Sequence, residues 1–259
     1  TDTGLPFGGA ICKMLCAKFK ELDPTRPTMI AINSMLSTLA AMKAQQAAEK
    51  KGDGETVGSK EVNDIVALLP KIRASLTPDS LEAIIHDCAE AVDIVGYNYG
   101  HNLYAGTHEK FPERVILSSE TFPARMASNW NTVLENDYVI GDFHWTAWDY
   151  LGEAGVGLPV YGTSQAPFSK SYPAFTAACG SVDLIGQPES AAIYTAILWG
   201  TYDKPYIGVR PVNHSGEKYA LGNWRMTDSV ASWTWPGCEG RCAEIEVFSP
   251  GVEVELQQD

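Results

Sequence analysis

Apolar residues along most of this chain fall into short continuous runs, which are separated by segments with helical spacing. The runs at residues 29–32, 92–97, 114–118 and 138–143 predict strands buried on both faces. Helices are predicted at residues 11–22, 37–51, 77–92, 123–135 and 190–199. This alternation of strands and helices predicts an α/β fold with a buried parallel sheet.

The pattern changes after Gly200. Apolar and polar residues alternate at residues 206–210, 243–248 and 252–256, which predicts strands with one face in water, as in an antiparallel sandwich. We therefore place a domain boundary near residue 202, with one domain over residues 1–202 and a second over residues 203–259.

Composition and charge narrow the class of partner. The chain has 259 residues, 45% of them hydrophobic, which is enough to bury a core. Its net charge of −13 argues against nucleic acid, because phosphate binding needs clustered Lys and Arg. No apolar run reaches about 18 residues, so we expect no membrane span. No signal peptide is visible; the location stays open, with the cytoplasm favoured and any signal expected upstream.

Six cysteines are present, and we interpret most of them as small buried hydrophobes. Cys238 and Cys242 flank a Glu-Gly-Arg turn, which leaves a local disulfide or half of a metal site open. No second pair of ligands with zinc spacing accompanies them. We therefore predict no metal and no cofactor, and a structural Mg or Na ion has no support in the sequence.

Polar and aromatic residues cluster where three predicted strands end. The first ends in Asn98 and Tyr99, the second in Glu120, and the third in the aromatic segment 144–150. In parallel barrels the reactive groups lie at the carboxyl ends of the strands. Aromatic faces stack on a pyranose, and a carboxylate can attack its anomeric carbon, so this pattern is typical of a sugar site.

Six segments resemble glycoside hydrolase family 2, most closely its bacterial β-galactosidase-like members. They are LDPTRP at 22–27, VDIVGYNY at 92–99, SSETFP at 118–123, GDFHWTAWDYLGE at 141–153, DLIGQP at 183–188 and SWTWPG at 232–237. The resemblance implies that residues 1–202 form the C-terminal half of a TIM (β/α)8 barrel, with a helical insertion at about 37–76. It implies that residues 203–259 form part of an Ig-like β-sandwich.

The resemblance also implies roles for individual residues. Glu120 occupies the place of the catalytic nucleophile, and Tyr99 corresponds to a tyrosine that hydrogen-bonds and orients that nucleophile. Trp145 corresponds to a tryptophan that lines the sugar pocket. Three further residues are weaker carry-overs as substrate-binding residues, namely Asn98, Trp148 and Asp149.

Each of these residues could instead have a purely structural role. Glu120 could be an ion-pair partner at a strand end, and Tyr99 could pack at the rim. Trp145 and Trp148 are three residues apart, so at strand period they face opposite ways, and we expect Trp148 to be the core residue. Glu153 follows a glycine and is interpreted as a polar loop residue. His144 departs from the small polar residue expected there.

One element of the implied mechanism is missing. Retaining hydrolysis needs a second, protonated carboxyl group about 5 Å from the nucleophile. In the family this is the Glu of an Asn-Glu pair, and the chain contains no such pair. We therefore expect the acid/base residue to lie outside this chain, in an upstream half of the same enzyme or in a complementary chain. Glu113 or Glu153 as a replacement acid is the alternative.

The leading hypothesis is a retaining exo-β-glycosidase that acts on a β-linked sugar by double displacement, in an assembly that we expect to be a homo-oligomer. A catalytically silent carbohydrate-binding or assembly module is one alternative. A β-glucuronidase or β-mannosidase of the same family is another. The sequence does not identify the glycone or the linkage.

Overall fold

The computed structural model describes residues 8–34, 36–38, 72 and 76–257. The chain divides into two compact units, one formed by residues 1–121 and 128–144, the other by residues 122–127 and 145–259. Apart from residues 37 and 38, the predicted helix at 37–51 lies outside the described residues, as does most of the predicted insertion at 37–76. The domain boundary predicted near residue 202 stays a prediction.

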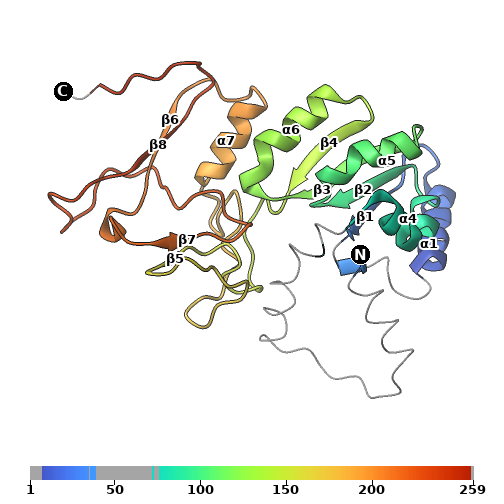
Figure 1. Ribbon diagram of the computed structural model, residues 1–259, viewed down its shortest axis with the longest axis horizontal. Coiled ribbons are helices and arrows are strands. Elements are labelled where there is room, and N and C mark those ends of the chain that lie inside the picture. The colour runs from blue at the N-terminus through green and yellow to red at the C-terminus, as the bar shows by residue number, and fades with distance from the viewer. Residues whose placement is uncertain (1–7, 35, 39–71, 73–75, 258–259) are drawn as a thin grey trace. The chain divides into compact units, whose positions relative to one another are not determined.

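A parallel four-stranded sheet forms the centre of the first unit, in the order β1-β2-β3-β4 (Figure 1). The strands are β1 (Met29–Asn33), β2 (Ile94–Asn98), β3 (Val115–Thr121) and β4 (Val139–His144). Ile32, Val95 and Ile116 are almost fully buried, which explains the apolar runs of β1, β2 and β3. All four predicted strands of this sheet are confirmed, but the prediction that they are buried on both faces is wrong for β4, where Ile140 and Phe143 are exposed.

Helices precede or connect these strands, with one helix before β1 and the others between consecutive strands. They are α1 (Gly8–Leu22), α4 (Pro78–Ala89), η1 (His101–Leu103), α5 (Tyr104–Lys110), η2 (Pro123–Arg125) and α6 (Met126–Glu135). The helix predicted at 123–135 is therefore a short 3-10 turn followed by α6. The alternation of buried parallel strands with helices confirms the α/β class, while closure into a barrel stays a prediction.

Helix α4 begins with a capping box. The amide of Ser80 donates to the Thr77 hydroxyl at 3.2 Å, and the amide of Thr77 donates to the Ser80 hydroxyl at 3.0 Å. Both amides would otherwise lack a partner at the helix start, and Pro78 has no amide that needs one. The sequence signal that predicted a helix start at this point is therefore explained.

Replacing Thr77 by Ala should lower the local stability of α4 by about 1 kcal/mol, because the Ser80 amide loses the hydroxyl that accepts its hydrogen bond. Hydrogen exchange of the α4 amides measures this change. Thr132→Ala is the matched control, since its hydroxyl only donates to the Ser128 carbonyl within α6. Equal protection of α4 in Thr77→Ala and Thr132→Ala would contradict the prediction.

The second unit contains two antiparallel strand pairs and one α-helix. Strand β5 (Val160–Tyr161) pairs with β7 (Tyr219–Ala220), and β6 (Tyr206–Val209) pairs with β8 (Ile245–Phe248), as seen in Figure 1. Helix α7 (Ser190–Leu198) precedes β6, and a 3-10 turn, η3 (Val212–His214), follows it. The strands predicted at 206–210 and 243–248 are thus confirmed, and a sandwich stays a prediction.

The strand predicted at 252–256 is wrong. These residues are irregular, and Val252 is fully exposed. The preceding Pro250 has no amide donor, and Gly251 weakens extended structure, so the chain leaves the sheet at the end of β8. The alternation of apolar and polar residues predicts a strand only where a neighbouring strand can pair with it, and the described residues pair none with 252–256.

A small core holds the second unit together around three buried residues, Val156, Ala177 and Cys179. Four partly buried aromatic residues pack against it, namely Trp145, Tyr150, Phe168 and Trp224. All six cysteines of the chain carry free thiols, so Cys238 and Cys242 do not form the local disulfide that their spacing left open. Within the described residues, no helix has the length and apolar character needed to cross a bilayer.

Candidate functional site

The carboxyl ends of β2 and β3 bring Asn98 and Glu120 together. Tyr97 pairs with Ser118, but the next residue, Asn98, pairs with Glu120, so Ser119 is an extra residue in β3. Such a bulge changes the direction of the following side chain, and bulges are common beside active sites. The Ser119 hydroxyl donates to the Asn98 side-chain carbonyl at 2.7 Å, which ties the bulge to the end of β2.

Tyr99 joins this group through the backbone. Its amide donates to the carbonyl of Glu120 at 2.6 Å, and its side chain is only 6% exposed. Its φ is +56°, in the left-handed region that a bulky residue rarely adopts. Strained positions of this kind concentrate at functional sites. The structure therefore places three predicted site residues, Asn98, Tyr99 and the partly buried Glu120, at one sheet edge.

A buried polar cluster fixes the backbone just after Glu120. The Thr121 hydroxyl donates to Asp142 of β4 and accepts from the Asn129 amide at 3.0 Å. Ser118 lies 2.7 Å from the same hydroxyl. Burial raises the pKa of Asp142, and hydrogen bonds from Thr121 and Ser118 partly offset that effect. Glu120 thus lies between an anchored bulge and an anchored Thr121, which restricts its position.

His144 closes β4 beside this cluster. Burial lowers the pKa of its imidazole, and the nearby Asp142 only partly opposes this shift. A neutral ring is therefore favoured at neutral pH. The cluster was not foreseen from the sequence, because single Ser, Thr and Asn residues in strands and helices carry no periodic signal.

Trp145, Trp148 and Asp149 belong to the second unit. The Trp145 indole is partly buried and donates to the Tyr150 hydroxyl at 3.1 Å. Asp149 accepts from the Cys179 amide at 3.2 Å through its carboxylate, and its own amide donates to Val182. Its carboxylate thus has a structural partner.

The expectation that Trp148 is the core residue is wrong, because its side chain is 57% exposed. Strand β4 ends at His144, so the period of two that places side chains on alternate faces does not extend to Trp148. The end of the strand could not be located from residue pattern, since aromatic residues continue past it.

The two alternative acids lie in different settings. Glu113 precedes β3, at the strand end opposite to Glu120, so about seven residues of extended chain separate them by roughly 20 Å. Such a separation rules out a carboxyl pair about 5 Å apart. Glu153 belongs to the second unit and accepts a hydrogen bond from Tyr150. Neither Tyr150 nor this contact was singled out from the sequence.

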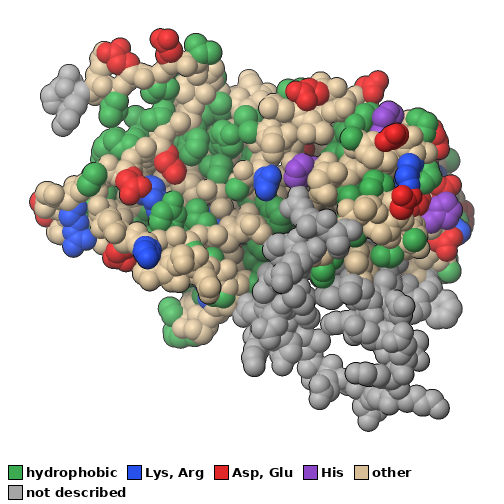
Figure 2. Space-filling view, viewed as in Figure 1, with side chains coloured by type: hydrophobic (Ala, Val, Ile, Leu, Met, Phe, Trp, Pro, Cys, Tyr) green, Lys and Arg blue, Asp and Glu red, His purple; other side chains and the backbone are tan. Residues whose placement is uncertain are grey.

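Among the described residues, one group has the spacing of a metal site, formed by Glu82, His86 and Glu90. The Arg114 guanidinium already binds both oxygens of Glu82, at 2.8 and 2.9 Å, and lies 3.5 Å from Glu90. A cation there would meet that positive charge, so the group is an ion-pair cluster. On the face drawn in Figure 2, Lys and Arg side chains stand among acidic ones and form no continuous basic surface.

No family model matches the chain, and no curated protein sequence matches it. A solved structure of a glycosyl hydrolase family 2 member from Bacteroides cellulosilyticus matches 96% of this chain and 26% of its own, with a TM-score of 0.64 and 24% identity. A second family 2 structure, from Bacteroides cellulosilyticus DSM 14838, matches 96% of this chain and 24% of its own, with a TM-score of 0.58 and 22% identity. The chain therefore shares the fold of part of these proteins and spans about a quarter of their length.

Proposed function

We propose that this chain is part of a family 2 glycoside hydrolase, a retaining β-glycosidase in which Glu120 is the nucleophile. The bulged end of β3 carries the proposal, because it presents a carboxylate beside Asn98 and Tyr99 at the carboxyl edge of a parallel sheet. The shared fold supports it, as do the sequence segments that surround these residues.

The proposed reaction has two displacements. The Glu120 carboxylate attacks the anomeric carbon while the bond to the leaving oxygen breaks, which gives a covalent glycosyl ester. Water then attacks the same carbon, and the sugar leaves with its original configuration. The Tyr99 hydroxyl would hydrogen-bond the carboxylate, which favours its ionised form and fixes its direction.

The resemblance to the family supports roles for aromatic residues in the proposed sugar pocket. The Trp145 indole would stack on the sugar, and the exposed face of Trp148 would extend the binding surface. Asp149 would support the pocket through the loop it holds at Cys179. Asn98, bonded to Ser119, would contact a sugar hydroxyl.

The complete enzyme would supply what these residues lack. A retaining mechanism needs a proton donor about 5 Å from Glu120, and we place this acid/base carboxyl in polypeptide outside this chain. The same polypeptide would complete a (β/α)8 barrel from the four parallel strands, and residues 203–259 would belong to a following sandwich. We propose a β-linked sugar substrate, β-galactosides first, and a homo-oligomeric assembly.

Covalent trapping tests the function directly. The full-length protein is incubated with 2-deoxy-2-fluoro-β-galactosyl fluoride, whose fluorine slows breakdown of the glycosyl ester while its leaving group speeds formation. We expect the intact mass to rise by one fluoroglycosyl group, and peptide mapping to locate that group on Glu120. A label on another residue would contradict the proposal. So would a lack of label with the galactosyl, glucuronyl and mannosyl reagents alike.

A further inference from the structure

A directed series of hydrogen bonds begins at Trp145 in the second unit and ends at Glu153. The Trp145 indole nitrogen donates to the Tyr150 hydroxyl at 3.1 Å, and that hydroxyl donates to the Glu153 carboxylate. An indole only donates and a carboxylate only accepts, so the direction of both bonds is fixed by chemistry. The Tyr150 hydroxyl, once committed to Glu153, presents its lone pair to Trp145.

Packing holds the same two rings from other sides. The rings of Trp145 and Tyr150 meet edge to face, with centroids 5.9 Å apart and planes at 83°. Both rings pack against the core of Val156, Ala177 and Cys179. The Ala177 amide donates to the Tyr150 carbonyl at 2.9 Å, so the backbone of Tyr150 is fixed as well. The indole is therefore restrained both along its edge and over its face.

Glu153, the last acceptor in this series of hydrogen bonds, lies in a turn with an unusual backbone conformation. Gly152 and Gly155 have φ of +110° and +73°, and Glu153 between them has a φ of +43°, which is costly for a residue with a side chain. The Glu153 carbonyl accepts from the Val156 amide at 3.0 Å, and the Lys170 ammonium donates to the carbonyls of Gly155 and Pro167. The turn is thus closed on both sides and holds Glu153 under Tyr150.

The geometry points to Tyr150 and Glu153 as positioning residues that set the orientation of the Trp145 indole toward the sugar. This inference rests on the proposed function, in which Trp145 stacks on the substrate. Loss of the Tyr150 hydroxyl leaves the ring in place and keeps the packing over the indole face, but it removes the hydrogen bond that fixes the indole edge. Binding of the sugar then becomes weaker, while the attack by Glu120 is unchanged.

Tyr150→Phe in the full-length protein tests this step. The substrate is the glycoside whose fluorinated analogue labels the protein. We expect its KM to rise about 5-fold, which corresponds to the free energy of one lost hydrogen bond, and kcat to change less than about 2-fold. Tyr172→Phe is the matched control, because Tyr172 is 89% exposed, and it should leave both constants unchanged. Glu153→Ala should resemble Tyr150→Phe, and Glu153→Gln, which keeps a carbonyl acceptor, should restore most of the binding.

A double-mutant cycle shows whether Tyr150 acts through Trp145. Trp145→Phe keeps an aromatic face but lacks the donor nitrogen, so adding Tyr150→Phe to it should raise KM no further. Independent, multiplying effects would overturn the inference, as would an unchanged KM in Tyr150→Phe. In either case, loss of activity in Glu120→Gln would leave the proposed function standing. Full activity in Glu120→Gln would instead remove the proposed function itself.

Discussion

Replacing Glu120 by Gln in the full-length protein should lower kcat on aryl β-glycosides by on the order of 10⁴-fold or more, because the covalent intermediate can no longer form. Gln has nearly the size of Glu, and the backbone around it is fixed by the Tyr99 amide and by Thr121. The thermal midpoint should therefore stay close to that of the unaltered protein. Steady-state kinetics and calorimetry on the same preparation measure both quantities.

Glu113→Gln is the matched control for this change. Glu113 is exposed and stands at the opposite end of β3, so activity should be retained. Near-normal turnover in Glu120→Gln would contradict the assignment, and so would an equal loss in Glu113→Gln. Chemical rescue adds a positive result. With Glu120→Ala, azide and a substrate with a good leaving group, we expect the α-glycosyl azide, because azide enters from the face that the carboxylate has vacated.

Much of the first unit could be predicted from sequence because its strands and helix starts depend on residues that are close together in the chain. Strands buried on both faces must be apolar throughout, and helix starts need Ser, Thr or Pro at defined positions. The runs that became β1 to β3 and the cap at Thr77 follow these rules, whereas β4 leaves Ile140 and Phe143 exposed. The carboxyl ends of the strands then indicated where Asn98, Tyr99 and Glu120 would gather.

The detailed geometry of the candidate site could not be read in the same way. The bulge at Ser119 depends on which residue of β2 faces which residue of β3, and this pairing is a property of two separate strands. The left-handed φ of Tyr99 has no composition signal, because the residue is not Gly or Asn. The role of Tyr150 depends on a hydrogen bond whose acceptor, Glu153, looked like an ordinary loop residue.

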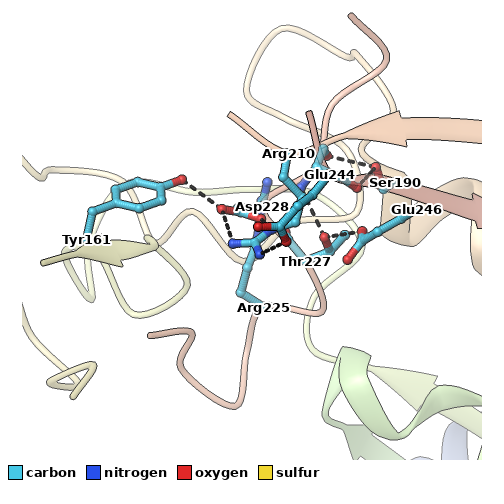
Figure 3. A network of polar contacts seen from close by, with 9 residues as sticks. Tyr161, Ser190, Arg210, Arg225, Thr227, Asp228, Glu244 and Glu246 are labelled. Carbon is cyan, nitrogen blue, oxygen red and sulfur yellow. Dashed lines mark hydrogen bonds and ion pairs between the residues drawn. The ribbon is translucent and has the colours of Figure 1, made fainter. Parts of the chain in front are cut away.

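The second unit depends on a buried ion pair, and Asp228→Asn should lower its stability by about 3 kcal/mol. Asp228 accepts from Arg210 at 2.7 and 3.1 Å and from the Tyr161 hydroxyl at 2.9 Å, and its side chain is only 2% exposed (Figure 3). Neutralising it leaves the largely buried Arg210 charge with one remaining carboxylate, Glu244. Hydrogen exchange of the β6 amides at increasing urea concentration measures the loss in free energy of unfolding.

Glu244→Gln is the matched control, because it removes the other carboxylate of the same guanidinium. Glu244 is 60% exposed, and pairs in water contribute at most about 1 kcal/mol. A loss in Glu244→Gln as large as that in Asp228→Asn would show that burial does not decide the strength of this network. Equal stability of the unaltered protein, Asp228→Asn and Glu244→Gln would show that water solvates the Arg210 guanidinium as favourably as Asp228 pairs with it.

Acid unfolding gives a second measurement of the same pair. Burial alone would raise the pKa of Asp228, but hydrogen bonds from Arg210 and Tyr161 outweigh it and hold that pKa below its ordinary value. A carboxyl group of this kind stabilises the folded state above its unfolded pKa, about 4, and the contribution disappears as pH falls through the lower folded pKa. The unaltered protein should therefore lose stability in β6 below about pH 4. Asp228→Asn should lack this part of the pH dependence, because the group that titrates has been removed, whereas Glu244→Gln should retain it.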